Sequence, residues 1–266
     1  MTVHAFGLGT FRLKGQTVID SVRNALDVGY RAIDTAQIYG NEAALGHALL
    51  EAGAKRDELF LTTKVWVDNY RTERFAASVD ESLDKLGVDR VDLLLLHWPG
   101  DAVPIPEQIA MLDAVQAAGK TRHVGVSNQN AAQMAQSVRL SRAPIVTNQV
   151  EIHPYLDQTD LIAAAKACGV ALTAYYGMAD GRVPRDPSLG AIGDRYGKTA
   201  AQVVLRWLVQ QGFVALTKTA RPERVAQNAA IFDFVLSEPD MAAIAAPARA
   251  DGRLVSPPRL APDWNA

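Results

Sequence analysis

The sequence predicts a single domain of the (β/α)8 barrel class. Short apolar segments rich in β-branched residues alternate about eight times with segments in which apolar residues recur at helical spacing. No Pro- or Ser-rich linker divides the 266 residues, and barrels commonly exceed ~200 residues as one domain. With 48% hydrophobic residues the chain can fill one large core, so we expect one domain over residues 1–266.

The expected strands are short and apolar, and several end in a polar residue. The run DLLLLHW contains four consecutive leucines, which is typical of a strand buried on both faces of a parallel sheet. His97 follows the last leucine. Taken alone, a polar residue at this place marks only the point where the strand is no longer buried. The expected strands cover residues 4–10, 30–34, 59–64, 92–98, 122–128, 145–151, 171–176 and 213–218.

The segments between these strands have the spacing of amphipathic helices. Several end in glycine, which favours the left-handed conformation of a helix C-terminus. The expected helices cover residues 17–29, 42–53, 74–87, 106–120, 158–169 and 199–212, and a further helix opens near Pro222. We also expect a short N-terminal β-hairpin. The proline-rich segment LVSPPRLAPDWNA cannot be helical, so we expect an extended C-terminal tail over the barrel mouth.

An open doubly wound sheet is the alternative architecture. A dinucleotide-binding sheet of that kind carries G-x-G-x-x-G between its first strand and first helix. The segment GLGTFR lacks the last glycine and leads into a polar turn. The closed barrel is therefore the better prediction.

Composition excludes several kinds of partner. The formal net charge is −2 and the 27 Lys and Arg residues are scattered, which disfavours nucleic acid. We find neither a signal-peptide pattern nor a run of about 18 apolar residues, so we expect a cytoplasmic protein without membrane contact. Cys168 is the only cysteine, which excludes an intrachain disulfide and a Cys-based zinc site.

Four titratable residues follow expected strands and converge on the barrel rim, where barrel enzymes have their active sites. They are Asp34, Tyr39, Lys64 and His97. A lysine beside a tyrosine lowers the phenol pKa from its usual ~10, and a carboxylate keeps that lysine charged. A histidine beside them can donate a hydrogen bond to a carbonyl oxygen. This set suits proton delivery during carbonyl reduction by a nicotinamide cofactor.

The chain resembles the aldo-keto reductases, and within them the bacterial 2,5-diketogluconate and methylglyoxal reductases. The segments AFGLGTFRL, GYRAIDTAQIYGNE, TTKVW, LLLLHWP, VGVSN, NQVEIHPYL and RLVSPPRLAPDW carry the resemblance in order over nearly the whole chain. The resemblance implies an NADPH-dependent barrel in which Tyr39 donates the proton. Lys64 and Asp34 would support its acidity, and His97 would orient the carbonyl.

The resemblance also implies cofactor and substrate contacts. Tyr175 would stack on the nicotinamide, whose carboxamide Ser127, Asn128 and Gln149 would hold. Lys218, Thr219 and Arg224 would bind the 2′-phosphate, which favours NADPH over NADH. The remaining implied cofactor residues are Thr10, Phe11, Gln227 and Asn228, and the implied substrate residues are Trp66, Trp98 and Trp264.

Three positions depart from the family pattern. Tyr176 replaces a serine that contacts the pyrophosphate, Thr217 replaces a proline before the phosphate-binding lysine, and Gln129 replaces a frequent aromatic residue. His153 matches a position behind the site, where we expect a structural role. The family resemblance further implies a monomer, and we expect small aldehydes, dicarbonyls or keto-sugars as substrates and no metal.

Two other functions remain open from the sequence. A metal-dependent barrel hydrolase could use Asp34, His97 and Glu151, although the five histidines are dispersed. A nicotinamide-binding redox sensor or structural barrel with little turnover would keep the fold without the reaction. The presence of all four catalytic residue types favours the reductase.

Overall fold

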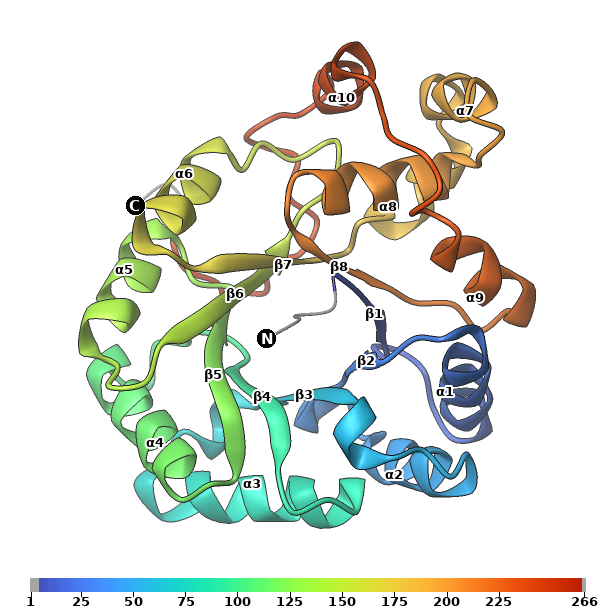
Figure 1. Ribbon diagram of the computed structural model, residues 1–266. Helices are drawn as coiled ribbons and strands as arrows, with labels where there is room; N and C mark the ends of the chain where they lie inside the picture. Colours follow the sequence, from blue (N-terminus) through green and yellow to red (C-terminus); the bar gives the residue numbers. More distant parts are fainter. Residues whose placement is uncertain (1–4, 265–266) are drawn as a thin grey trace.

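The computed structural model describes residues 5–264, and its eight parallel strands close into a barrel in sequence order (Figure 1). The last strand pairs with the first, since Phe6 to Leu8 lie beside Ala215 to Thr217. The strands are β1 (Phe6–Gly9), β2 (Ala32–Asp34), β3 (Phe60–Val65), β4 (Val91–Leu96), β5 (Thr121–Ser127), β6 (Ile145–Glu151), β7 (Ala171–Tyr175) and β8 (Val214–Thr217). The predicted fold class is confirmed.

Helices surround the barrel on its outside (Figure 1). Those that follow the successive strands are α1 (Gln16–Val28), α2 (Glu42–Glu51), α3 (Thr72–Leu86), α4 (Ile105–Ala117), α5 (Ala131–Leu140), α6 (Thr159–Cys168), α8 (Ala200–Gln210) and α9 (Pro222–Ala229). Short helices α7 (Pro187–Asp194) and α10 (Glu238–Ala245) are additional. Among residues 5–264, none of the helices is long and apolar enough to cross a membrane.

The sequence analysis did not predict α5. Its sequence AAQMAQSVRL is rich in alanine and glutamine, so apolar periodicity marks it poorly. Its start is marked instead by a capping box, in which Asn130 and Gln133 exchange side-chain and backbone hydrogen bonds. Such a motif was a readable signal for the missing helix.

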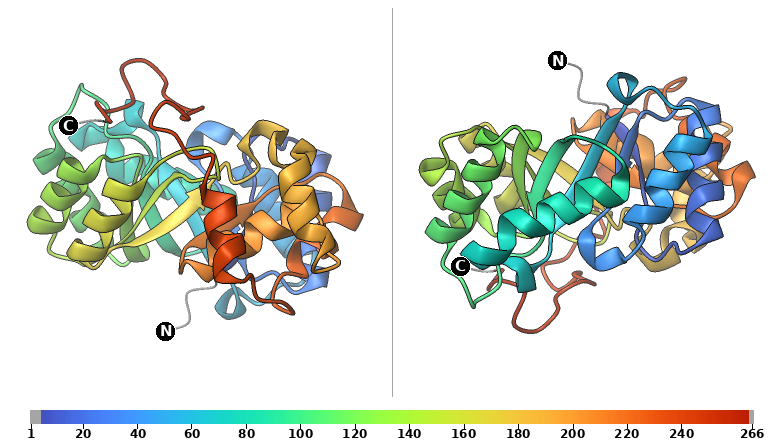
Figure 2. Two further views of the ribbon diagram at one scale, coloured as in Figure 1. Left: turned by 90° about the horizontal axis from the view of Figure 1, so that it is seen from above. Right: turned by 90° about the horizontal axis from the view of Figure 1, so that it is seen from below.

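The expectations for the two ends of the chain stay predictions in part. Residues 1–4 lie outside the described residues, and β1 pairs in parallel with β2 and β8. After α10, the tail up to Trp264 runs without helix or strand over one end of the barrel (Figure 2). This segment includes a turn, in which the backbone N–H groups of Leu260 and Ala261 donate to the Pro257 carbonyl.

The strand β4 shows how burial places a polar residue at the rim. Leu93 to Leu96 are buried between β3 and β5, and His97 follows the last leucine directly. At the other end of the same strand, Asp92 is buried and accepts the backbone N–H of Leu61 at 2.9 Å. The leucines therefore form core, while polar groups occupy both ends of the barrel.

Helices α2 and α3 approach closely at a glycine. A Cβ at Gly46 would lie 2.4 Å from the carbonyl oxygen of Lys85 and 2.9 Å from the carbonyl carbon of Leu86. Both atoms belong to the backbone, so neither can move aside cheaply. Gly190 in α7 offers a contrast, because a Cβ there would meet no atom within 4 Å.

We predict opposite effects of alanine at these two helical glycines. Gly46→Ala should lower the free energy of unfolding by about 1–3 kcal/mol, because it overpacks a helix crossing. Gly190→Ala should raise it by up to about 1 kcal/mol, because alanine has the higher helix propensity. Urea unfolding measures both, and a stabilising Gly46→Ala would contradict the close approach.

Candidate active site

A buried charged pair lies at the carboxyl end of β2 and β3. Asp34 is the last residue of β2. The Lys64 side chain is 1% exposed, and its ammonium forms an ion pair with Asp34 Oδ1. Lys64 Nζ also donates to the carbonyl oxygen of Thr35 at 2.9 Å and lies 3.4 Å from the Tyr39 hydroxyl. The other carboxylate oxygen of Asp34 accepts from the Gln149 amide at 2.7 Å. Three of the four predicted catalytic residues are thus in direct contact.

The pKa directions of this cluster bear on the expected role of Lys64. Burial raises the pKa of Tyr39 well above its usual value, and the Asp34 carboxylate acts in the same direction. Burial likewise lowers the pKa of Lys64, an effect that Asp34 opposes. Burial therefore opposes the lowering of the phenol pKa that a neighbouring ammonium produces. That Lys64 supports the acidity of Tyr39 stays a prediction.

His97 faces Tyr39 across the pocket. Its ring centroid is 5.7 Å from that of Tyr39 and 5.3 Å from that of Trp66, edge-on in both cases. Burial lowers the pKa of His97 well below its usual value, and Lys64 adds to this, so the imidazole is neutral. Within residues 5–264 its Nδ1 has no hydrogen-bond partner. A neutral imidazole beside a protonated phenol can position an oxygen acceptor.

The residues predicted to hold the nicotinamide form one hydrogen-bonded group. The Tyr175 hydroxyl donates to Asn128 Oδ1 at 2.6 Å, and the Asn128 amide donates to the carbonyl oxygen of His97 at 3.0 Å. The Ser127 hydroxyl donates to the backbone carbonyl of Gln149 at 2.7 Å. Asn128 adopts φ 59°, a left-handed conformation that asparagine tolerates better than most residues. The Tyr175 ring is held at the pocket wall by these bonds.

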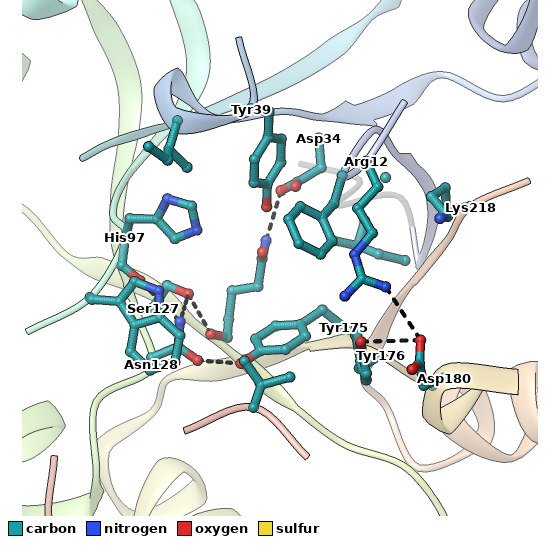
Figure 3. Close-up of a pocket in the computed structure, with 18 of the residues that line it drawn as sticks. Arg12, Asp34, Tyr39, His97, Ser127, Asn128, Tyr175, Tyr176, Asp180 and Lys218 are labelled. Atoms are coloured by element: carbon teal, nitrogen blue, oxygen red, sulfur yellow. Dashed lines mark hydrogen bonds and ion pairs between the residues drawn. The ribbon is translucent and has the colours of Figure 1, made fainter. Parts of the chain in front are cut away.

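Cations lie at the other side of the same pocket (Figure 3). Lys218 follows β8 and Arg12 follows β1, and both line the cavity. The Arg12 guanidinium is 3.4 Å from Asp180 Oδ1, to which the Tyr176 hydroxyl also donates at 3.3 Å. Burial lowers the pKa of Lys218, Arg12 acts in the same direction, and Asp180 opposes both. The Tyr176 hydroxyl is thus bonded to Asp180 in the loop after β7 and is not a free donor toward the pocket.

The loop before α9 and the helix itself carry the other residues predicted to bind the cofactor. Arg224 and Gln227 are exposed, whereas Thr219 and Asn228 are buried. The Asn228 amide donates to the Thr217 hydroxyl at 3.0 Å. Thr217 therefore ties the end of β8 to α9, a bond that the proline of the family pattern could not make.

One pocket of about 460 Å³ connects the Tyr39 cluster, the Asn128 group and the cation Lys218. Of the predicted residues, those that line it are Phe11, Asp34, Tyr39, Trp66, His97, Trp98, Ser127, Asn128, Gln149, Tyr175 and Lys218. Lys64 lies behind Tyr39. Thr10 also lies behind the wall, where its hydroxyl donates to the Asp34 carbonyl at 3.0 Å. The tail contributes Val255, Pro257 and Leu260 to the lining.

Trp264 does not belong to this lining. Its ring lies under the Arg253 guanidinium at 3.5 Å, and its Nε1 donates to the Ser256 hydroxyl at 3.1 Å. These contacts are within the tail itself. The structure therefore places Trp66 and Trp98 at the pocket and Trp264 in the segment that covers it.

The sequence analysis missed several pocket residues. Arg12 directly follows Phe11, so a cation beside the first strand was a readable signal. Ile38, Met178 and Asp180 also line the pocket but lie on loops whose course the sequence does not reveal. Gln129, expected near the nicotinamide, points away from the pocket and accepts from the Ser137 hydroxyl in α5 at 2.8 Å.

The described part of the chain contains no group of three or more His, Cys, Asp or Glu residues placed to hold a metal ion. Glu151, which the hydrolase alternative requires, is bonded to His153 at 2.9 Å. The hydrolase alternative therefore has no ligand cluster within residues 5–264.

The fold and the site define a class: a (β/α)8 barrel whose rim holds a buried Asp34–Lys64–Tyr39 cluster beside a pocket that cations line at its other side. The sequence model of the aldo/keto reductase family matches residues 5–248, and the chain belongs to this family. It is 43% identical to a methylglyoxal reductase, DkgB, of Salmonella typhi over the full length of both. It is 38% identical to a glyoxal reductase of Bacillus subtilis over 89% of this chain and 86% of that protein.

Solved structures agree with this assignment. One described as a 2,5-diketo-D-gluconic acid reductase B superposes with a TM-score of 0.97 at 57% identity, covering 98% of this chain and 94% of the other. The aldose reductase of Schistosoma japonicum gives 0.93 at 29% identity, covering 98% and 93%. The protein is accordingly an oxidoreductase of carbonyl compounds, from a family that uses nicotinamide cofactors.

We predict that Asp34→Asn destabilises the protein by about 3–5 kcal/mol, because it leaves Lys64 buried without its counter-charge. The double variant Asp34→Asn with Lys64→Met should recover part of that loss. Urea unfolding at neutral pH is measured for the natural protein, for Asp34→Asn, for Lys64→Met and for the double variant. Asp251→Asn is the control, since it breaks an ion pair with Arg249 whose side chains are 74% exposed and should have little effect. A double variant as unstable as the sum of the single changes would contradict the coupling.

Proposed function

We propose that this protein reduces small aldehydes, dicarbonyls or keto-sugars to alcohols with NADPH, and that Tyr39 donates the proton. The supporting observation is the position of the Tyr39 hydroxyl, 3.4 Å from Lys64 Nζ, with the His97 ring centroid 5.7 Å from that of Tyr39. Burial favours the protonated phenol and the neutral imidazole, because it raises the pKa of Tyr39 and lowers that of His97. A phenol with a raised pKa carries the proton that an alkoxide needs. The redox sensor alternative does not require this arrangement.

The residues present are suited to a nicotinamide dinucleotide. The Tyr175 ring is fixed at the pocket wall, beside the polar side chains of Asn128 and Gln149. Lys218 at the other side of the pocket offers a cation, and its lowered pKa reflects a partly desolvated ammonium that an anion would favour. When bound, the reduced nicotinamide would supply the hydride. Thr10 lies behind the pocket wall and would support the cofactor site from there. The other residues that would contact the cofactor are Phe11, Ser127, Thr219, Arg224, Gln227 and Asn228.

The proton transfer assigns a separate task to each member of the cluster. The His97 imidazole is neutral, because burial lowers its pKa. It can donate a hydrogen bond that aligns the carbonyl oxygen beside Tyr39. Tyr39 gives its proton to that oxygen as negative charge develops. The Lys64 ammonium, 3.4 Å away, stabilises the resulting phenolate, while Asp34 keeps Lys64 charged and directed toward it. Catalysis here depends on prearranged charges.

The substrate side of the pocket is small and mainly apolar. Trp66 and Trp98 line it together with Ile38 and the tail residues Val255 and Leu260. Such a lining favours small carbonyl compounds over large polar ones. Methylglyoxal is therefore a candidate substrate, and 2,5-diketogluconate is a second candidate because of the similarity to the solved structure described as a 2,5-diketo-D-gluconic acid reductase B. Trp264 would contribute by shaping the tail. We further propose that residues 1–266 form one domain acting as a monomer in the cytoplasm.

We predict that Tyr39→Phe lowers the rate of carbonyl reduction by at least about 100-fold, because phenylalanine keeps the ring but removes the proton. NADPH affinity should remain nearly unchanged. NADPH oxidation with methylglyoxal, an aromatic aldehyde and 2,5-diketogluconate measures the first effect, and fluorescence titration the second. Turnover by this variant equal to that of the natural protein would refute the assignment, whereas tight NADPH binding by both proteins without turnover would favour the sensor.

We also predict that Lys218→Ala with Arg224→Ala weakens NADPH binding by about 100-fold and NADH binding far less. Each charged side chain would make a charge-assisted hydrogen bond to the 2′-phosphate, which NADH lacks. Comparison of the two dissociation constants is the measurement. An equal loss for both cofactors would show that these cations do not recognise the 2′-phosphate.

A further inference from the structure

A buried carboxylate at the end of β6 has no part in the proton transfer. Glu151 and His153 are both fully buried, and the His153 Nε2 lies 2.9 Å from Glu151 Oε1. His153 Nδ1 accepts the backbone N–H of Tyr155 at 3.2 Å, so the ring proton resides on Nε2. His153 therefore donates to Glu151 and orients its carboxylate.

The other partners of Glu151 belong to the C-terminal tail. The backbone N–H of Leu254 donates to Oε1 at 2.8 Å, and that of Val255 donates to Oε2 at 2.9 Å. More than 100 residues separate these partners along the chain, since the two bonds span 103 and 104 positions. One carboxylate thus fixes two consecutive residues of an otherwise irregular segment.

This attachment lies where the tail turns toward the pocket. Val255 itself lines the cavity, as do Pro257 and Leu260 farther along. A second link reinforces it, because the Gln158 amide donates to the Glu151 carbonyl at 2.8 Å and accepts from Arg253 at 3.3 Å. Farther along, the tail is held by single bonds, such as the 2.7 Å bond from the Asn130 amide to the Asp263 carbonyl.

The charge of Glu151 matters because all three donors face the same carboxylate. A neutral amide in its place would turn an N–H₂ group toward at least one of them and leave that donor unpaired. Glu151 is adjacent to Tyr175 in the register of β6 and β7. The tail is therefore attached beside the wall that bears the stacking tyrosine.

We propose that Glu151 is a positioning residue that fixes the tail from Leu254 to Leu260 over the substrate side of the pocket, and that it thereby sets carbonyl affinity. The inference rests on the proposed reductase function for its kinetic consequence. Its structural consequence, an ordered tail, does not depend on turnover. His153 serves as the support that orients the carboxylate.

The test compares Glu151→Gln with Asp92→Asn. Asp92 is a matched control because it is also a buried carboxylate that accepts a backbone N–H, from Leu61, and pairs with Arg56 at 2.7 Å. It lies at the opposite end of the barrel from the pocket. Hydrogen–deuterium exchange of the tail amides and steady-state kinetics with methylglyoxal are measured for both variants and for the natural protein.

In Glu151→Gln the amides of Leu254 and Val255 should exchange at least about 10-fold faster, and KM for the carbonyl should rise about 10-fold, the loss expected for a charged hydrogen bond. The kcat and the NADPH dissociation constant should stay nearly unchanged. Asp92→Asn should lower resistance to urea without changing tail exchange or KM.

A folded Glu151→Gln protein with natural tail exchange would overturn the proposal. So would faster exchange in Glu151→Gln that is spread evenly over the barrel and not concentrated in the tail. Faster tail exchange with an unchanged KM would reject the effect on affinity while leaving the reductase function intact. If no carbonyl is turned over by the natural protein, the reductase function fails, and exchange still tests the attachment.

A second variant keeps the proposal testable if Glu151→Gln does not fold. Leu254→Pro removes one tail donor while the carboxylate remains, and Leu254 is an exposed side chain outside the pocket lining. It should raise KM and tail exchange in the same direction as Glu151→Gln. Where Glu151→Gln folds, the KM effects in the double variant should be less than multiplicative, because both changes break the same attachment. Independent effects would overturn it.

Discussion

The site depends on the ion pair between Lys64 and Asp34 inside the barrel mouth. Both side chains are almost fully removed from water, and two isolated charges at this depth would be very costly. The pair is tolerated because further groups satisfy it, namely the Thr35 carbonyl and the Gln149 amide. Tyr39 borders this pair, so the Tyr39 hydroxyl and the Lys64 ammonium that would stabilise its phenolate lie side by side.

The closed barrel is what allows this pair to exist. Asp34 ends β2 and Lys64 lies near the end of β3, and these strands are paired in parallel at Asp34 and Thr62. Parallel pairing brings the carboxyl ends of neighbouring strands to one rim, and the helices outside exclude water from the strands below. The same rim holds the Asn128 group and the cations, so the proposed proton donor and the proposed cofactor site share one scaffold.

Loops and the tail complete the pocket above this rim. The loops after β1 and β7 meet through Arg12 and Asp180, and the tail is attached to the barrel through Glu151. These contacts join segments without regular backbone hydrogen bonding, so their strength depends on single side chains. Such segments vary more readily than the strands they connect.

The sequence by itself determined the barrel, the strand ends and the identity of the rim residues, because strand and helix periodicity and turn residues are local signals. Its apolar periodicity did not indicate α5, whose alanines and glutamines carry little periodicity, although the capping box at Asn130 and Gln133 was present to be read. Only the tertiary structure decided that Tyr39 and Lys64 are buried beside Asp34, since burial depends on everything packed around these side chains. It also decided that Gln149 binds Asp34, that Trp264 stays within the tail and that Glu151 holds the tail, because these contacts join distant segments through irregular backbone that local pattern cannot specify.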